Sequence, residues 1–312
     1  MTTALPQPIF LAGPTAVGKS AVALLLAEQL EGEIISVDSM QVYRGLDIGT
    51  ANPTPVEQEK IPHHLIDVAN LDEVFDAARF GRLAERAMAE IQSRGRVPIF
   101  CGGTGFYFKA YLEGLGAAPP ADASLRSELE TVPLPELLAE LAERDPKIFA
   151  QIDQRNPRRV LRAIEVIRLT GKPFSEQRAD WQRDKENPFA PRSFGLMRAK
   201  ADLHERTIRR VDEMFRRGLV TETEQLLARG LEQNQTATQA IGYRQVIEHL
   251  HGQHTLAETV ELVKIRTRQF AKRQLTWFRR QLQLNWIKLE TAASAEQAAN
   301  QIRAFLSGGE LR

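Results

Sequence analysis

Cysteine is nearly absent from this chain, whose 312 residues include a single one, Cys101. One cysteine excludes an internal disulfide and a zinc site built from several cysteines, and it suits a reducing compartment. Long apolar runs are also missing, and residues 1–8 lack the basic-then-apolar pattern of a secretory signal. We therefore expect a cytoplasmic protein without a membrane partner, and the sequence indicates no obligate protein partner.

The chain also lacks a large excess of either sign of charge, because it contains 41 Lys and Arg residues and 40 Asp and Glu residues. The segment 264–280 differs, since it holds seven basic residues and no acidic one, with Phe270, Trp277 and Phe278 among them. On a helix, four of its basic residues would share a stripe: Lys264, Arg268, Lys272 and Arg280. A solvated helix face normally mixes both signs, so this segment favours contact with a nucleic-acid backbone, with aromatic rings that could stack on bases.

Smaller groups of arginines occur at two other places in the chain. One group is Arg155, Arg158, Arg159 and Arg162, and the other is Arg206, Arg209 and Arg210. His63 and His64 have no third metal-ligand candidate nearby, so we expect a structural role for them. We expect Cys101 to be a buried thiol of the core.

A complete phosphate-binding loop follows the apolar run 9–12 and precedes a predicted helix over 20–30. Its residues fit G-x-x-x-x-G-K-[ST]: Gly13, Pro14, Thr15, Ala16, Val17, Gly18, Lys19 and Ser20. The glycines let successive N–H groups face a phosphate chain, and the helix N-terminus adds its dipole. Lys19 supplies a positive charge, and the Ser20 hydroxyl is a candidate ligand for Mg²⁺. The loop predicts binding of a di- or triphosphate.

Two further segments should lie beside this loop at the carboxyl ends of parallel strands. Asp38 ends the predicted strand 33–37, where it could act as a magnesium ligand or as a general base. The glycine loop 102–105 follows the predicted strand 97–101 and brings the hydroxyl of Thr104 into the same crevice.

The order of the elements predicts an α/β fold, a P-loop NTPase-like parallel sheet flanked by helices, with a helical insertion. We expect the core domain to comprise residues 1–118 and 195–312, including C-terminal helices, and the insertion to comprise residues 119–194. Residues 44–64 should be irregular, and a helix capped by Asp72 should extend to residue 94. Pro98 argues against a central place for its strand. Residues 175–192 should form a charged loop, and helices should dominate after a short strand near 194–197.

Taken in order, the motifs closely resemble those of the bacterial tRNA dimethylallyltransferase (tRNA isopentenyltransferase) family. They are the phosphate loop 13–20, the segments 38–43, 47–51 and 62–65, the glycine loop 102–105, and the segments 239–243 and 271–279. The match omits only about the last thirty residues. The phosphate loop alone occurs in many families, whereas this ordered set is far more specific.

The resemblance implies transfer of the dimethylallyl group from dimethylallyl diphosphate to the N6 amine of the adenosine immediately 3′ of the anticodon in tRNA. It implies Mg²⁺ as cofactor and a phosphate loop that holds the prenyl diphosphate. The target base would flip into a channel, and the insertion would grip the anticodon stem-loop. By family match, Asp38, Thr104, Lys19 and Arg210 are catalytic residues, with Asp38 as the base and Arg210 on the diphosphate.

The positions that the resemblance matches to tRNA contact fall into several short stretches. They are Asp38, Ser39, Met40, Gln41, Thr104, Arg126, Arg158, Arg159, Val160, Leu161, Arg162, Gln239, Ala240, Ile241, Gly242, Tyr243, Arg244, Lys272, Arg273, Gln274, Leu275, Thr276, Trp277, Phe278 and Arg279.

Three other functions share part of this pattern. A small-metabolite kinase would use the phosphate loop and Asp38 but has no need of the basic segment 264–280. A prenyltransferase acting on free AMP or ATP does not need that extended surface either. An RNA-binding protein with a vestigial loop is opposed by the intact set of Lys19, Ser20, Asp38 and Thr104.

Overall fold

The computed structural model describes residues 5–179, 181, 187–290 and 295–308, and the chain divides into two compact units. The larger unit comprises Met1–Leu112 and Glu186–Arg312, and the smaller one comprises Glu113–Lys185. The boundaries at 113 and 185 precede the predicted ones at 119 and 194. The second boundary lies earlier than predicted because strand β5 (Ser193–Arg198) already belongs to the sheet of the larger unit.

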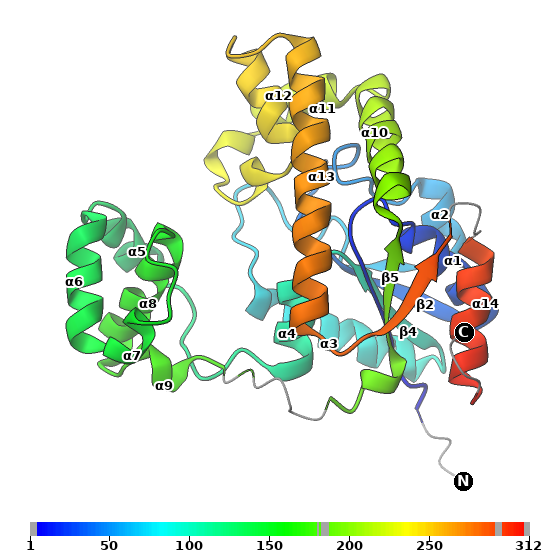
Figure 1. The fold of residues 1–312 in the computed structure, drawn as a ribbon, viewed down its shortest axis with the longest axis horizontal. Helices are drawn as coiled ribbons and strands as arrows, with labels where there is room; N and C mark the ends of the chain where they lie inside the picture. Colours follow the sequence, from blue (N-terminus) through cyan, green and yellow to red (C-terminus); the bar gives the residue numbers. More distant parts are fainter. Residues whose placement is uncertain (1–4, 180, 182–186, 291–294, 309–312) are drawn as a thin grey trace. The chain divides into compact units, whose positions relative to one another are not determined.

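A six-stranded sheet forms the centre of the larger unit (Figure 1). Its strands are β1 (Ile9–Ala12), β2 (Gly32–Val37), β3 (His63–His64), β4 (Val97–Gly102), β5, and β6 (Asn285–Leu289). Their order across the sheet is β3-β2-β4-β1-β5-β6, and every pairing is parallel. The parallel α/β sheet predicted from the sequence is confirmed.

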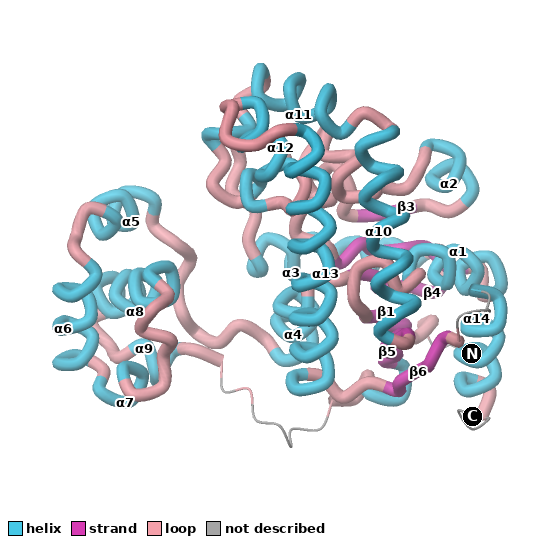
Figure 2. Tube along the Cα trace, turned by 45° about the horizontal axis from the view of Figure 1, so that its top comes forward, coloured by secondary structure: helices cyan, strands magenta, loops and turns pink. Residues whose placement is uncertain are grey.

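Helices cover both faces of this sheet, as Figure 2 shows. Helices α1 (Lys19–Gln29) and α14 (Ala295–Leu306) pack on one face in a cluster that includes Leu11 of β1. Helices α3 (Ala77–Ser93) and α4 (Gly105–Glu113) supply aromatic rings to the other face, where Phe10 of β1 stacks on Phe100 of β4 with 4.7 Å between ring centroids. Because neighbouring strand residues point to opposite faces, the fully buried pair Phe10 and Leu11 anchors both layers.

Four helices of the C-terminal part complete the larger unit: α10 (Lys200–Arg216), α11 (Leu219–Ala228), α12 (Tyr243–Leu250) and α13 (Leu256–Gln281). The long helix α13, orange in Figure 1, contacts both α10 and α12. It begins with a capping box in which Thr255 and Glu258 satisfy each other's backbone N–H groups. The buried side of α13 includes Val263, Ala271 and Phe278.

Helices make up most of the regular structure that is described for the smaller unit, and they enclose a hydrophobic core of their own. Its helices are α5 (Ala123–Glu130), α6 (Leu134–Arg144), α7 (Pro146–Phe149), α8 (Pro157–Thr170) and α9 (Phe174–Gln177). Leu141, Val160 and Ile164 are among the fully buried residues of that core. The predicted loop over 175–192 overlaps α9, and its residues 180 and 182–186 lie outside the described residues.

Several local predictions are wrong for identifiable physical reasons. The stretch 44–64 contains helix α2 (Pro55–Lys60), closed by a capping box between Thr54 and Glu57, and it also contains β3. Asp76, not Asp72, caps α3, because its carboxylate accepts from Arg79 N at 2.7 Å.

Two further differences concern the sheet. Pro98 lies in β4, which is a central strand, so that prediction is wrong. The strand tolerates a proline there because the pairing of β4 with β1 starts only at Ile99, and the missing N–H lies before that ladder. After α13 the chain adds strand β6 and helix α14, and the prediction that helices dominate this part of the chain did not include that strand. None of the described helices has the length and apolar character needed to cross a bilayer.

Candidate active site

The three loops singled out in the sequence meet at one level of the sheet. Ala12 at the end of β1 pairs with Gly102 at the end of β4, and Gly102 pairs on its other side with Val37 at the end of β2. Residues that follow parallel strands in this register gather at the carboxyl edge of the sheet. Parts of the phosphate loop, Asp38 and the glycine loop 102–105 line one cavity there, so their predicted convergence is confirmed.

The phosphate loop is held so that an anion can approach its amide groups. Gly18 has φ 107°, in the left-handed region that favours glycine, and it caps α1 without a side-chain hydrogen bond. Arg206 Nε donates to Ala16 O and Arg198 Nε to Val17 O, each at 2.8 Å. The N–H of a trans peptide points opposite to its C=O, so the Gly18 amide faces away from Arg198. The first turn of α1 holds no acidic residue, so the helix dipole at this end favours the approach of an anion.

Arg198 and Arg206 hold the phosphate loop in place, a role for which the sequence did not single them out. Arg206 stood out only as part of an arginine cluster, and Arg198 ends β5 without a motif. Arg198 is itself buried and pairs with Asp202 at 2.8 Å. Their distance in the sequence from the loop, about 180 to 190 positions, explains why only the fold reveals the contact.

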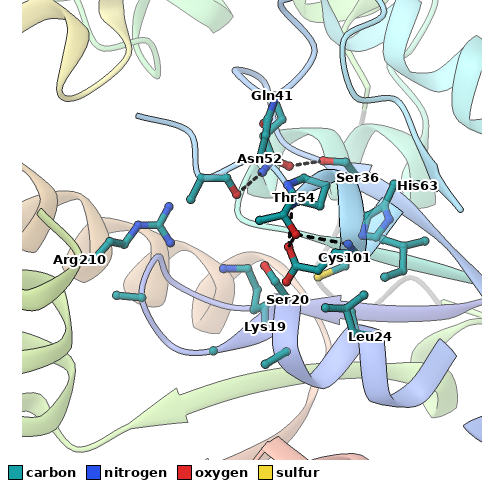
Figure 3. Close-up of a pocket in the computed structure, with 18 of the residues that line it drawn as sticks. Lys19, Ser20, Leu24, Ser36, Gln41, Asn52, Thr54, His63, Cys101 and Arg210 are labelled. Atoms are coloured by element: carbon teal, nitrogen blue, oxygen red, sulfur yellow. Dashed lines mark hydrogen bonds between the residues drawn. The ribbon is translucent and has the colours of Figure 1, made fainter. Parts of the chain in front are cut away.

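Lys19 of α1 and Arg210 of α10 are among the basic residues that line the cavity drawn in Figure 3. Lys19 Nζ donates to Pro14 O at 2.8 Å, and burial lowers the pKa of this amine to about 8. Burial also lowers the pKa of the Arg210 guanidinium, which nevertheless stays charged. Arg210 Nε is buried without a hydrogen-bond partner among the described residues. Both groups would gain from the approach of a polyphosphate.

The Asp38 carboxylate and the Thr104 hydroxyl line a second cavity together with Lys19 and Arg210. Asp38 Oδ1 accepts from Met40 N at 2.9 Å and Gln41 N at 3.4 Å, which orients the carboxyl group. Burial raises the pKa of Asp38, while the Met40 hydrogen bond and the Lys19 charge oppose that shift. Thr104 Oγ1 accepts from Ser39 N at 3.0 Å, and this contact ties the glycine loop to the residue beside Asp38. A carboxylate with a raised pKa in a crevice suits a proton acceptor.

Two cavities meet at Lys19. The smaller one, of about 360 Å³, brings Lys19, Asp38, Thr104 and Arg210 together. The larger one, of about 650 Å³, extends from Lys19 and Ser20 past residues of α2 and α10 and is the one drawn in Figure 3. Cys101 packs against the hydrophobic core, as predicted, but it is only partly buried and also lines both cavities. Burial raises its pKa to about 11 and keeps the thiol protonated.

A pH effect follows from Lys19. We expect the affinity of the protein for inorganic diphosphate to fall as the pH rises through about 8, because the amine then loses its charge before the ligand binds. Calorimetric titration between about pH 6.5 and 9.5 measures this change. The matched variant Lys19→Arg keeps its charge throughout. A parallel decline in that variant would show that a protein group other than Lys19 causes the effect.

The basic segment on α13 is divided between the surface and the interior. Lys272, Arg273 and Arg279 are exposed, and Arg273 lines the smaller cavity 5.9 Å from the centre of the Phe270 ring. Lys264 instead pairs with Asp212 and Glu261. The predicted stripe therefore does not act as one free surface.

Phe278 is fully buried and meets Phe108 edge-on, so its ring belongs to the core and is not available to stack on a base. Gln274 is also buried. Phe270 remains 38% exposed. Of the three aromatic residues in the segment, Phe270 is the one most open to a base.

The segment 239–244 is divided in the same way. Gln239 and Ile241 line the smaller cavity. Tyr243 is fully buried, donates to Glu222 Oε1 at 2.5 Å and accepts from Gly49 N at 3.0 Å. Glu222 also accepts a hydrogen bond from the backbone N–H of Ile48, the residue before Gly49. Tyr243 and Glu222 therefore hold the 47–51 loop against the cavity, a role for Glu222 that no motif indicated.

In the smaller unit, the predicted tRNA-contacting arginines have unequal freedom. Arg126 and Arg162 both pair with the fully buried Glu165, at 2.8 and 2.7 Å. Arg158 and Arg159 are exposed at the start of α8, as is Arg155 just before it. Val160 is fully buried in the core. The exposed arginines, with Leu161 only half-buried, form the accessible part of this cluster.

We expect Glu165→Gln to destabilise the smaller unit by about 1–3 kcal/mol, because two partly exposed guanidinium groups would lose a charged hydrogen-bond partner. Hydrogen exchange of the α5 and α8 amides measures this opening without requiring the whole chain to unfold in one step. Glu143→Gln, at an exposed position of the same unit, is the matched control. Equal exchange in the two variants would show that the buried ion pair contributes little.

The sheet, the flanking helices and the phosphate-loop motif define an α/β protein with a P-loop NTPase-like fold. A family model described as IPP transferase matches residues 41–281. A tRNA dimethylallyltransferase from Methylococcus capsulatus is 44% identical over 308 residues, covering 97% of this chain and 98% of that protein. The relative from Pelotomaculum thermopropionicum, with the same name, is 41% identical over 96% of each chain. The chain belongs to the IPP transferase family.

Solved structures agree with this assignment. The full-length tRNA isopentenylpyrophosphate transferase of Bacillus halodurans matches with a TM-score of 0.71 and 38% identity, over 98% of this chain and 96% of that one. A eukaryotic dimethylallyltransferase described as acting on tRNA matches with a TM-score of 0.78 and 27% identity, over 98% of this chain and 81% of that one. The resemblance found in the sequence is confirmed.

Proposed function

We propose that this chain transfers the dimethylallyl group of dimethylallyl diphosphate to the N6 amine of the adenosine immediately 3′ of the anticodon in tRNA. The observation that carries the proposal is the single cavity lined by Lys19, Asp38, Thr104 and Arg210, with the exposed Arg273 at its wall. It joins a polyphosphate site to a proton acceptor beside a basic helix. The names of the relatives support the same reaction. A tRNA substrate would place the protein in the cytoplasm.

The chemistry asks for a base next to a leaving-group site. The N6 lone pair attacks the first carbon of the prenyl chain, and the carbon–oxygen bond breaks with its electron pair leaving on diphosphate. The amine is a weak nucleophile because its lone pair is delocalised into the purine ring. Asp38 accepts the N6 proton as the new carbon–nitrogen bond forms, which yields the neutral product. The burial that raises the pKa of Asp38 makes its carboxylate a stronger proton acceptor.

Negative charge grows on the diphosphate during this step. Lys19, Arg210 and the N–H groups at the start of α1 face the place where that charge develops. The described residues contain no cluster of three or more His, Cys, Asp or Glu side chains suited to a metal. The exposed Ser20 hydroxyl in the same cavity fits Mg²⁺, which favours few protein ligands and substrate phosphate oxygens. When bound by Ser20 and the diphosphate, Mg²⁺ would add positive charge at the leaving group.

The RNA would contact exposed basic side chains rather than the whole of each matched stretch. On the larger unit these are Lys272, Arg273 and Arg279 of α13. On the smaller unit, which we propose grips the anticodon stem-loop, they are Arg155, Arg158 and Arg159. Phosphate contacts of this kind position the RNA and make its binding dependent on salt.

One incubation tests the function. The protein receives labelled dimethylallyl diphosphate and Mg²⁺ with either tRNA or AMP, and the products are digested to nucleosides. We expect label on adenosine from tRNA only. Label on AMP would favour a prenyltransferase acting on free nucleotides. Labelled phosphate transferred from ATP to a small acceptor, with no prenyl transfer, would favour a kinase.

A further inference from the structure

A buried amide side chain connects the two glycine-containing loops of the site. Gln274 lies in the middle of α13 and is 8% exposed. Its Oε1 accepts from Thr15 N in the phosphate loop, and its Nε2 donates to Gly103 O in the glycine loop, both at 2.8 Å. The Gln274 amide therefore forms one hydrogen bond with each of two loops that follow neighbouring strands.

This contact depends on the chemistry of both partners. A Cβ added to Gly103 would lie 2.5 Å from Gln274 Nε2, so the close approach requires glycine. Gln274 provides an acceptor toward one loop and a donor toward the other. A carboxylate of equal size would keep the contact with Thr15 N but would face the Gly103 carbonyl with a second acceptor. A thioether would leave both backbone groups unpaired in a buried place.

The two loops carry the groups that the proposed transfer needs. On one side of the Gln274 amide, Thr15 follows Pro14, whose carbonyl holds Lys19 Nζ at 2.8 Å. On the other side, Gly103 precedes Thr104, whose hydroxyl accepts from Ser39 N beside Asp38. The amide therefore lies between the cation of the leaving-group site and the carboxylate that takes the proton.

We propose that Gln274 is a positioning residue for the transfer reaction: it sets the phosphate loop and the glycine loop at the spacing that aligns donor and acceptor. This role rests on the proposed function and differs from the RNA contact that the resemblance implied for the same residue. A small change in the spacing of reacting groups has a large effect on rate, on the order of 10²-fold for 1 Å. Substrate affinity, in contrast, is distributed over many other contacts.

The test compares Gln274→Met with Gln269→Met, the same change at an exposed position of α13. Single-turnover transfer is measured at saturating tRNA and donor, alongside the tRNA Kd, the donor KM and the thermal unfolding midpoint. We expect Gln274→Met to slow the transfer step about 10- to 100-fold while the tRNA Kd and donor KM change less than about threefold. Gln269→Met should behave as the unsubstituted chain does. Gln274→Glu, which keeps the Thr15 contact, replaces the Met variant if that variant does not fold and should also slow transfer.

Three results would overturn the inference. A transfer rate close to that of the unsubstituted chain would show that the bridge is dispensable. A rise in the tRNA Kd as large as the loss in rate would return Gln274 to direct RNA contact. Equal losses in Gln274→Met and Gln269→Met would point to a general effect on α13. Absence of transfer by the unsubstituted chain would contradict the proposed function itself, and that result is separate from any comparison of variants.

Discussion

Asp38→Asn is expected to lower the single-turnover transfer rate by on the order of 10²–10⁴-fold. An amide has the size of the carboxyl group and can still accept from Met40 N, so the local turn should persist. It cannot take up the N6 proton, and the attacking amine then keeps its positive charge in the transition state. Because Asp38 is one of many groups along the crevice, the tRNA Kd should stay nearly unchanged.

The measurement is quenched-flow transfer with enzyme in excess over tRNA, combined with a filter-binding Kd. Asp72→Asn, at an exposed position, makes the same chemical change outside the site and should retain full rate. An Asp38→Asn enzyme that transfers at full speed would remove Asp38 from the role of base. A carboxylate with a raised pKa should also produce an acidic limb in the rate profile that Asp38→Asn lacks.

Lys19→Ala is expected to reduce kcat/KM for the prenyl donor by on the order of 10²–10³-fold, because a charge aimed at the leaving diphosphate disappears. Arg273→Ala should instead weaken tRNA binding and leave use of the donor intact. The tRNA Kd should rise, and the slope of log affinity against log salt concentration should fall by about one. The reason is that Lys19 belongs to the phosphate loop and faces both cavities, whereas Arg273 borders only the smaller cavity and lies exposed on α13.

Each of these two variants serves as the control for the other. Donor KM, tRNA Kd and the dependence of that Kd on salt are measured for both. A Lys19→Ala enzyme with weakened tRNA binding and an unchanged apparent affinity for the donor would contradict the separation of the two electrostatic sites.

Burial decides which of the positions matched to tRNA contact an RNA can reach. A resemblance transfers whole stretches, such as 239–244 and 272–279, but a helix turns every residue to a different side. Tyr243 and Phe278 are consequently fully buried within stretches whose neighbours are exposed. The side chains that lie inward hold the site together, and those that lie outward remain available to a large partner.

The sequence alone determined the parts of this protein that depend on local order. The phosphate loop is contiguous, so spacing predicted it completely, and the alternation of apolar runs with helical patterns predicted the parallel sheet. Strand ends predicted that Asp38 and the glycine loop 102–105 would join the phosphate loop, because parallel strands place their carboxyl ends at one edge. Charge patterning indicated the basic helix α13.

Only the tertiary structure decided how distant residues share the work. The phosphate loop depends on Arg198, Arg206 and Gln274, which lie about 180 to 260 positions away in the sequence. The same packing sets Glu222 on the 47–51 loop and withdraws Arg126 into an ion pair with Glu165. A buried hydrogen bond or ion pair requires partners fixed in space, and local propensity carries no information about which distant backbone group a side chain will meet. For that reason the chemistry of this site could be anticipated from its motifs, whereas the contacts that position it became visible only in the fold.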